Sequence, residues 1–446
     1  MDAKRNRLFF EIMKKTVFLL SSMLVVMTFL SIVSCSKDLY DKDQYEQYLD
    51  YNSPVDSIDS RHQWVLTKMQ QYRITAPTGM NVEVAMILAE NPLTESTAHV
   101  LNQAKISDGG SVTLPVTIPM TQTYLYAALV DKEGKYYVVR FPVSQTTIEF
   151  KTYSYGTPSS LTLKPQAFTY IFEENFPLAG DYDYNDLVIR IGVEKVPDNP
   201  RQLTLEATLI AVGCQHQLAG MVRLLNCMYD DIDSIKTANG KTFNDDLPAA
   251  STELYNNRDL FIRGRNNEAI INMFIDAHWV MNTSQDVLEN SGALAVRKYY
   301  NTSLSNTDEY ESRPYQTQRY NVYFKSEEKV RNFTTEQLDP FILAIYNGAR
   351  YETHRYELQA AQVLFPYQVE YRIKDLPWSF TIPVEKFCHP LEGVQIGFRK
   401  RTQTGTPAMF GAYTVRGHSF GEWVENCETN LDWYNNPANK NDVWIF

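Results

Sequence analysis

The stretch FEENFPLAGDYDYNDLVIRIGV, residues 172–193, joins a loop rich in side-chain oxygens directly to an apolar strand. Aliphatic side chains stand at every second position from Leu187 to Val193, which is the periodicity of a β-strand rather than of a helix. The residues before Leu187 are dominated by aspartate, glutamate and asparagine. The sequence therefore predicts an acidic loop that leads into a β-sheet.

The spacing of the loop oxygens is typical of a calcium site. Asp181, Asp183 and Asn185 stand at alternate positions and can converge on one centre, and Ca²⁺ accepts about six to eight oxygen ligands. An EF-hand is excluded, because Asp186 occupies the position of its glycine and Gly192 that of its closing glutamate. The candidate ligands are Asp181, Asp183, Asn185, Asp186, Glu173 and Glu174. The alternative is a solvated turn whose Asp and Asn side chains bond their own backbone.

The run from Phe172 to Val188 resembles the signature of LruC-domain proteins, which are exported lipoproteins and surface proteins of Bacteroidetes and other bacteria. The C-terminal part is similar to a domain of unknown function that closes many such proteins. The residues that carry this second resemblance are Asp339-Pro340-Phe341-Ile342, Pro377-Trp378, Ile382-Pro383, Phe387, Pro390 and Asp432-Trp433-Tyr434. The chain departs from the pattern at Thr353-His354-Arg355, where relatives carry a more apolar strand, and at Cys388. The resemblance implies a β-rich, exported protein and implies no reaction.

The first 35 residues have the pattern of a lipoprotein signal. A lysine pair at 14–15 precedes an apolar run from Val17 to Val33, which is followed by Ser34-Cys35, so that Cys35 is the candidate for lipidation. The alternative is a transmembrane anchor, although the apolar run is near the lower limit for a spanning helix. The following Ser36-Lys37-Asp38 resembles surface-export signals of Bacteroides. We therefore expect an outer-membrane lipoprotein at the cell surface, with the periplasmic face as the alternative.

Charge and motifs argue against several classes of function. The formal net charge of −11 disfavours a nucleic-acid partner, because phosphate binding needs a basic surface. Neither G-x-S-x-G nor H-E-x-x-H occurs, and the sequence has no glycine-rich phosphate loop. A glycoside hydrolase would need two carboxylates, from Glu173, Glu174 or Asp183, held across a sugar cleft, and adjacent acids in a loop do not guarantee that geometry. The sequence predicts a protein that is not an enzyme.

Four cysteines besides Cys35 could form two disulfides in an exported protein. They are Cys214, Cys227, Cys388 and Cys427. We favour pairing Cys214 with Cys227 and Cys388 with Cys427, and free buried thiols are the alternative. No C-x-x-C occurs and the seven histidines are scattered, so the sequence gives a zinc site little support.

The remaining patterns predict an all-β fold with two β-sandwich (jelly-roll-like) domains. The predicted organisation is a lipoprotein signal at 1–35, a tether at 36–61, an N-terminal sandwich at 62–150, a linker at 151–165 and a LruC-like β domain at 166–446. Predicted strands include residues 82–88, 124–130, 136–143, 168–172, 187–193, 203–211, 319–324, 341–346, 380–382 and 394–398. Strands 187–193 and 203–211 should form a hairpin. Residues 230–265 are interpreted as a long loop, and Ser419 and Glu422 have capping-box spacing for one short helix.

These features together predict a lipid-anchored protein of the cell envelope with a binding or structural role and a calcium-stabilised loop. One alternative is a carbohydrate-binding surface lipoprotein of a glycan-use system. Trp378, Trp423 and Trp433 could then form a sugar-stacking platform, although tryptophans of β-sandwiches are more often core residues. Another alternative is an adhesin or fimbria-associated component. The expected partners are the membrane, through the lipid, and a glycan or protein ligand.

Replacing the predicted lipidation site tests the interpretation of the signal. The variant Cys35→Ser should accumulate as an unprocessed precursor and lose incorporation of a labelled fatty acid, because the acyl chains are attached to the cysteine sulfur. Both are measured by gel mobility and by labelling in cells. Normal maturation of Cys35→Ser would contradict the lipoprotein interpretation.

Overall fold

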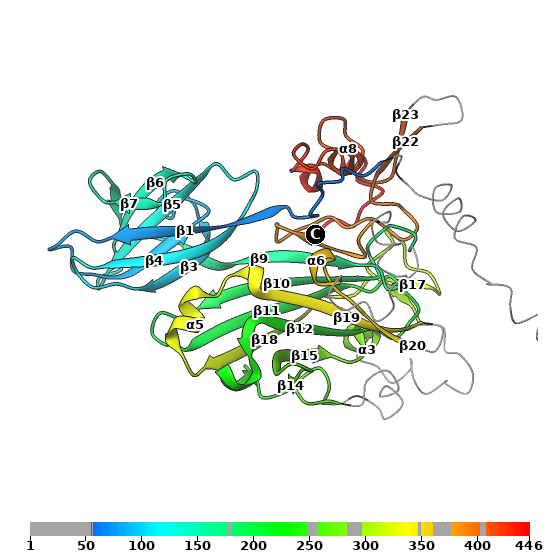
Figure 1. Cartoon of the computed structure of the whole chain (residues 1–446), viewed down its shortest axis with the longest axis horizontal. Coiled ribbons are helices and arrows are strands. Elements are labelled where there is room, and N and C mark those ends of the chain that lie inside the picture. The colour runs from blue at the N-terminus through cyan, green and yellow to red at the C-terminus, as the bar shows by residue number, and fades with distance from the viewer. Residues whose placement is uncertain are drawn as a thin grey trace, which may run out of the picture. The chain divides into compact units, whose positions relative to one another are not determined.

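β-Strands are the main secondary structure of the chain, as the alternating patterns predict (Figure 1). The computed structural model describes residues 55, 57–176, 180–245, 247, 257–282, 297–346, 349–359, 376–401 and 407–446. Within it, Ser57–Phe446 forms one unit by its internal contacts. The signal, Cys35 and most of the predicted tether lie outside the described residues. The prediction of an all-β sandwich fold is confirmed.

The first sandwich packs a three-stranded sheet, of order β4-β1-β7, against part of an eleven-stranded sheet. Its strands are β1 Thr67–Thr75, β2 Val82–Leu88, β3 Thr97–Lys105, β4 Ser111–Pro119, β5 Tyr124–Asp131, β6 Tyr136–Pro142, β7 Thr147–Glu149 and β8 Ser154–Gly156. The core between the two sheets joins Tyr72 and Leu114 of the smaller sheet to Ile87, Leu125 and Phe141 of the larger sheet. The strands predicted at 124–130 and 136–143 are confirmed as β5 and β6, which form an antiparallel pair.

One long strand, β9 (Thr162–Phe172), belongs to both halves of the eleven-stranded sheet (Figure 1). Its residues 162–165 pair in parallel with β3, and its residues 166–172 pair antiparallel with β10. The strand β21, Ser379–Ile382, pairs with residues 169–172 of β9. The segment 151–165, which we expected to be a linker, therefore contains β8 and the start of β9 instead of an irregular connection.

The second sandwich packs the strands β9-β10-β11-β18-β13 against a five-stranded sheet of order β14-β15-β12-β19-β20. Its strands are β10 Leu187–Lys195, β11 Gln202–Ala211, β12 Ala219–Met228, β13 Ile232–Thr237, β14 Phe261–Arg263, β15 Glu268–Phe274, β18 Gln316–Phe324, β19 Leu338–Tyr346 and β20 Ala349–Thr353. Ile189, Leu205 and Tyr320 of the large sheet share a core with Val222 and Ile271 of the smaller sheet. The predicted hairpin of β10 and β11 is confirmed by their antiparallel register. The acidic loop precedes β10, so it lies at the end of this hairpin that is opposite to the turn.

The shorter elements are mostly in the second half of the chain. They are α3 Ala277–Asn282, α5 Glu327–Asn332, α6 Tyr356–Gln359, α8 Phe420–Glu425, β16 Tyr299–Tyr300, β17 Tyr310–Glu311, β22 Phe398–Arg401, β23 Pro407–Phe410 and 3-10 turns at Tyr229–Asp231, Thr335–Gln337 and Trp433–Asn435. The predicted cap of α8 is present, because Ser419 Oγ accepts from Glu422 N at 3.2 Å and donates to Glu422 Oε2 at 2.8 Å. Among the described residues, no helix has the length and apolar character needed to cross a bilayer.

Two predicted elements are wrong. Residues 230–265 are not a continuous loop, since β13 pairs with β18 and β14 pairs with β15. A register shift between Ile232 and Ser234 breaks the two-residue period that would have revealed β13. The strand expected at 394–398 is also absent, because Gly393 and Gly397 have φ of +71° and +145°, and β22 begins only at Phe398.

Aromatic side chains of the C-terminal segment form a buried cluster. Trp423 and Trp433 are 0% exposed and Trp378 is 3% exposed, so the expectation that these tryptophans are core residues is confirmed. Phe380 of β21 packs on Trp423 and on Phe420 of α8. The cluster thereby joins the end of the chain to β9 through β21, and it leaves the tryptophans no open face for stacking on a sugar.

Candidate functional site

The loop between β9 and β10 is shaped by two tyrosines with left-handed backbone. The φ angle is +66° at Tyr182 and +53° at Tyr184, a conformation that is unfavourable by roughly 1–2 kcal/mol for residues with a Cβ. The buried Tyr184 donates a hydrogen bond from its hydroxyl to Pro377 O at 2.8 Å and packs on Phe380. Tyr182 packs on Phe398. These contacts stabilise the strained backbone of the two tyrosines. The residues that alternate with the tyrosines are the predicted ligands Asp181, Asp183 and Asn185.

Most of the predicted ligands are withdrawn from water. Glu173 and Asp183 are each 1% exposed and Asn185 is 0% exposed. Glu174 and Asp186 are each 6% exposed, whereas Asp181 is at the surface. A buried carboxylate is unfavourable unless it is paired or coordinates a metal. The loop therefore needs a compensating interaction for its negative charge.

The acidic side chains lie in two groups rather than one. Carboxylate oxygens of Glu173, Asp181 and Asp183 lie within 4.8 Å of one another. Oxygens of Glu174 and Asp186 lie within 4.8 Å of each other and of Cys214 Sγ. We call these the oxygen group and the thiol group. The predicted ligands thus come together in space, but Glu174 and Asp186 share their group with a cysteine that the sequence did not place here.

Backbone amides satisfy part of each group. Tyr184 N donates to Glu173 Oε1 at 2.7 Å, and Gly393 N donates to Asp183 Oδ2 at 2.9 Å. Glu174 N donates to Asp186 Oδ2 at 2.7 Å. Asn185 N donates to Asp183 Oδ1 at 3.2 Å, which is the kind of bond expected for a simple Asx-turn. A turn of this kind explains hydrogen bonds from nearby backbone amides, but it gives no partner to Glu173 Oε2.

Several buried oxygens have no hydrogen-bond partner among the described residues. They are Glu173 Oε2, Glu174 Oε2, Asn185 Oδ1 and Glu392 Oε2. Two glycines allow the close approach of these atoms. A Cβ at Gly180 would lie 1.6 Å from Glu173 Oε2, and a Cβ at Gly213 would lie 1.8 Å from Asn185 Oδ1. Unsatisfied buried acceptors are rare in native proteins and call for a specific partner.

The electrostatics of the loop are unfavourable for ionised carboxyl groups. Burial, and then the charges of Asp183 and Asp181, hold the pKa of Glu173 well above its usual range. Burial and Asp181 raise the pKa of Asp183, and burial and Glu174 raise the pKa of Asp186. A nearby cation would favour the ionised forms and remove this penalty.

Glu392 is a site residue that the sequence did not reveal. Burial, and then the carboxylates of Asp183, Asp181 and Glu174, raise the pKa of Glu392 to about 9. Glu392 reaches the loop because Gly393 N bonds Asp183 and Ile396 N bonds Tyr182 O at 2.7 Å. The residues around Glu392 carry no motif, so only the fold could bring this carboxylate to the loop.

The four cysteines are free thiols, so neither of the favoured disulfides is formed. Cys214 and Cys227 are buried side chains of the second sandwich core. Cys214 lies beside Asp186 because Gly213 N donates to Asp186 O at 3.1 Å, whereas Cys227 is on β12. Cys214 and Cys227 therefore do not pair, because Cys214 is held beside Asp186 while Cys227 is on β12.

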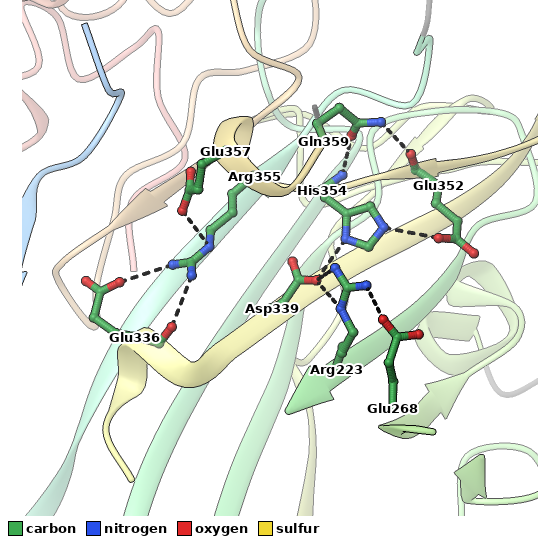
Figure 2. Close-up of polar contacts among 9 residues, drawn as sticks. All are labelled: Arg223, Glu268, Glu336, Asp339, Glu352, His354, Arg355, Glu357 and Gln359. Atoms are coloured by element: carbon green, nitrogen blue, oxygen red, sulfur yellow. Dashed lines mark hydrogen bonds and ion pairs between the residues drawn. The ribbon is translucent and has the colours of Figure 1, made fainter. Parts of the chain in front are cut away.

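A second polar cluster lies where the chain departs from the resemblance noted at Thr353-His354-Arg355. Asp339 Oδ2, which is fully buried, accepts from His354 Nδ1 at 2.9 Å and from Arg223 Nε at 2.9 Å. Figure 2 shows Arg223 also directed at Glu268, and His354 also directed at Glu352. Asp339 is the acid of the Asp-Pro-Phe-Ile run, and its contacts link β19 to Arg223 of β12 and to His354, the residue after β20.

This second cluster is a structural brace. Burial disfavours the imidazolium of His354, but the charge and hydrogen bond of Asp339 outweigh it and raise the pKa of His354. The His354 backbone and the Glu352 carbonyl are both bonded by Gln359 of α6, as Figure 2 shows. Arg355 forms a separate set of bonds with Glu336 and Glu357. The cluster therefore fixes β20 and α6 against β19.

The comparisons with known proteins concern the second half of the chain and the fold. A family model described as "Domain of unknown function (DUF4842)" matches residues 199–434, which include Cys214 and Glu392 but not the loop at 173–186. A solved structure described as a "Putative lipoprotein from Bacteroides ovatus" is 14% identical in sequence, and its alignment covers 81% of this chain and 99% of that chain with a TM-score of 0.45. A search of curated proteins found no match.

The stability of the brace should depend on pH with a defined sign. Because the folded pKa of His354 is raised above 6.5, its contribution is complete below about pH 6.5 and is lost as pH rises through the folded pKa. The difference in unfolding free energy between the native chain and His354→Gln should therefore decrease as pH rises above 6.5, by at most about 1.4 kcal/mol per pH unit. Denaturant titrations across this range measure the difference.

A second buried histidine provides a control of opposite sign. Burial lowers the pKa of His389 to about 4, so the native chain should gain stability relative to His389→Gln as pH rises from 4 to 6.5. A free-energy difference for His354→Gln that is flat or that grows above pH 6.5 would show that His354 is not held as an imidazolium.

Proposed function

The chain belongs to the family described as Domain of unknown function (DUF4842), and we propose that it is a lipid-anchored, non-catalytic protein of the cell envelope whose acidic loop is held by a structural calcium ion. The observation that carries the calcium proposal is the buried, unpartnered oxygen of Glu173 beside the carboxylates of Asp181 and Asp183. The membership itself brings no activity, so the proposal rests on the site.

The dimensions of the oxygen group suit calcium. Ca²⁺ binds oxygens at about 2.3–2.6 Å, so two oxygens on opposite sides of the ion lie roughly 5 Å apart. The carboxylate oxygens of Glu173, Asp181 and Asp183 lie within 4.8 Å of one another. Asn185 Oδ1 and Glu392 Oε2 are further candidates, because both are buried and without a partner among the described residues. Hard oxygen donors alone favour Ca²⁺ over softer metals.

A bound calcium would connect parts of the chain that are far apart in sequence. Asp183 is already bonded to Gly393, and Asn185 Nδ2 donates to Pro390 O at 3.2 Å. Neutralising the loop charge would stabilise these bonds together with the start of β10. The ion would thus act on folding rather than on a reaction.

The burial of the acids also supports a role without catalysis. A glycosidase needs both of its carboxylates at an open cleft that admits a sugar ring. Glu173 and Asp183 are each 1% exposed, and Glu174 is 6% exposed. Their oxygens are therefore placed to hold an ion or each other rather than a substrate.

The proposed location rests on the sequence of the N-terminus. Residues 14–35 have the lipoprotein pattern that ends at Cys35, and Ser36-Lys37-Asp38 resembles a surface-export signal. The run from Phe172 to Val188 resembles LruC-domain proteins, which are exported. We therefore place the protein in the outer membrane through its lipid, with the folded part at the cell surface.

Protease added to intact cells tests the surface location. The folded part should be cleaved from the outside, while a periplasmic marker protein in the same cells should stay intact. Complete protection of the chain in intact cells, followed by cleavage after the outer membrane is opened, would place it on the periplasmic face.

Calcium should raise the melting temperature of the chain, and Asp183→Asn should remove this response. Binding stabilises the folded state by RT ln(1 + [L]/Kd), about 2.7 kcal/mol when calcium is a hundred times its Kd. The variant keeps a hydrogen-bonding side chain but loses one charge. In EGTA, Asp183→Asn should melt at or above the melting temperature of the native chain in EGTA, because one repelling charge is removed. In millimolar calcium, Asp183→Asn should melt below the native chain, because only the native chain is stabilised by the ion.

The exposed Asp308 supplies a matched control. Asp308→Asn should behave like the native chain in both solutions. A simple Asx-turn predicts no effect of calcium on any of the three proteins, so equal melting of the native chain in EGTA and in millimolar calcium would refute the proposal.

A further inference from the structure

The thiol group differs from the oxygen group in its donor atoms. Cys214 Sγ and oxygens of Glu174 and Asp186 lie within 4.8 Å of one another, and all three residues are at least 94% buried. Glu174 Oε2 has no hydrogen-bond partner among the described residues. A buried carboxylate oxygen without a partner, next to a second carboxylate and a thiol, has the chemistry of an incomplete metal shell.

The backbone holds the two groups apart. Glu173 and Glu174 are consecutive but belong to different groups, which is expected where successive side chains point to opposite sides of an extended backbone. Asp183 and Asp186 are divided in the same way. Cys214 is fixed beside Asp186 by the bond from Gly213 N to Asp186 O and by His278 Nε2, which lies 2.8 Å from Cys214 O.

We propose that Glu174, Asp186 and Cys214 form a second metal site, distinct from the calcium site, for a borderline divalent cation such as Zn²⁺. A thiolate is a poor ligand for Ca²⁺ but a good one for Zn²⁺, which combines sulfur, imidazole and carboxylate ligands in tetrahedral sites. The cysteine thiol releases its proton to solvent when the metal binds. Water supplies the fourth ligand.

The three ligand atoms need to move only a short distance toward one another to bind Zn²⁺. Zn–S of about 2.3 Å and Zn–O of about 2.0–2.2 Å place tetrahedral ligand atoms roughly 3.5 Å apart. The three side chains start within 4.8 Å of one another, so they close by at most about 1.3 Å. Within the part of the chain that the structure describes, the thiol donates one weak hydrogen bond, from Cys214 Sγ to His216 O at 3.5 Å, and metal binding replaces it.

His216 gives the site an orienting group and a path to solvent. Its Nδ1 lies 2.8 Å from Glu174 Oε1, and half of its side chain is exposed. That contact leaves Glu174 Oε2 for the metal, in the manner of the outer hydrogen bonds that orient metal ligands. His216 therefore links the buried thiol group to the protein surface.

Cobalt substitution tests the site in the full chain. The protein is stripped with a chelator, saturated with calcium to fill the oxygen group, and titrated with Co²⁺ while the thiolate-to-cobalt charge-transfer absorption is recorded. One equivalent of Co²⁺ should produce the band, and Zn²⁺ should abolish it by displacement. Absence of the band in the native chain would overturn the proposal.

Variants assign the band and separate the two sites. Cys214→Ser should lose the band while keeping the calcium-dependent rise in melting temperature, and Cys227→Ser, which changes another buried core cysteine, should keep both. Asp183→Asn should lose the calcium response and keep the band. A band that survives Cys214→Ser, that vanishes in Cys227→Ser, or that vanishes together with the calcium response in Asp183→Asn, would contradict a separate site at Cys214.

A second variant, Glu174→Gln, tests the same site if Cys214→Ser does not fold. Glu174→Gln leaves the thiol in place and keeps the size of the side chain. It should weaken cobalt binding at least about tenfold, because loss of a ligand exceeds the effect of losing an orienting contact. Unchanged cobalt affinity in Glu174→Gln would remove Glu174 from the site. The calcium proposal would stand or fall by its own melting experiment in either case.

Discussion

Buried negative charge in the loop before β10 is the constraint on which the site depends. Carboxylates that are withdrawn from water repel one another and lack the solvation that would stabilise them. The chain nevertheless holds Glu173 and Asp183 in this loop, next to two tyrosines with strained, left-handed backbone. Glycines at 180 and 213 are also needed, because a Cβ at either position would collide with an unpartnered oxygen. Strain and unsatisfied acceptors that coincide in one loop are typical of a functional position that the rest of the structure stabilises.

The two sandwiches supply that stabilisation in different ways. The large sheet continues through β9 and fixes the start of the loop, while β10 and β11 fix its end within a core that is covered by the five-stranded sheet. The C-terminal segment then closes the loop, through hydrogen bonds at Gly393 and Ile396 and through aromatic packing on Tyr184. The brace of Asp339, His354 and Arg223 secures the opposite sheet. The loop is therefore held by residues far away in the sequence, such as Gly393, which is 210 positions after Asp183.

The sequence predicted what depends on local periodicity and missed what depends on topology. Alternation identified β10, β11 and their hairpin, and the density of acids identified the carboxylates that come together around Asp183. The contributions of Glu392 and Cys214 could not be predicted, because neither lies in a motif and both reach the loop only after the sheets have formed. β13 was missed because a register shift interrupts its pattern, and the segment before Phe398 was misassigned because its amides bond the loop instead of a neighbouring strand.

A crystal structure determined from calcium-containing solution, with anomalous diffraction data, will show whether calcium occupies the oxygen group. We expect an anomalous peak with oxygen ligands from Glu173, Asp181 and Asp183 at about 2.3–2.6 Å. An ion there would account for the unpartnered oxygens and the strained tyrosines together. If the density between these carboxylates instead shows only water, or direct hydrogen bonds between protonated acids, the loop is a turn and the calcium account is wrong.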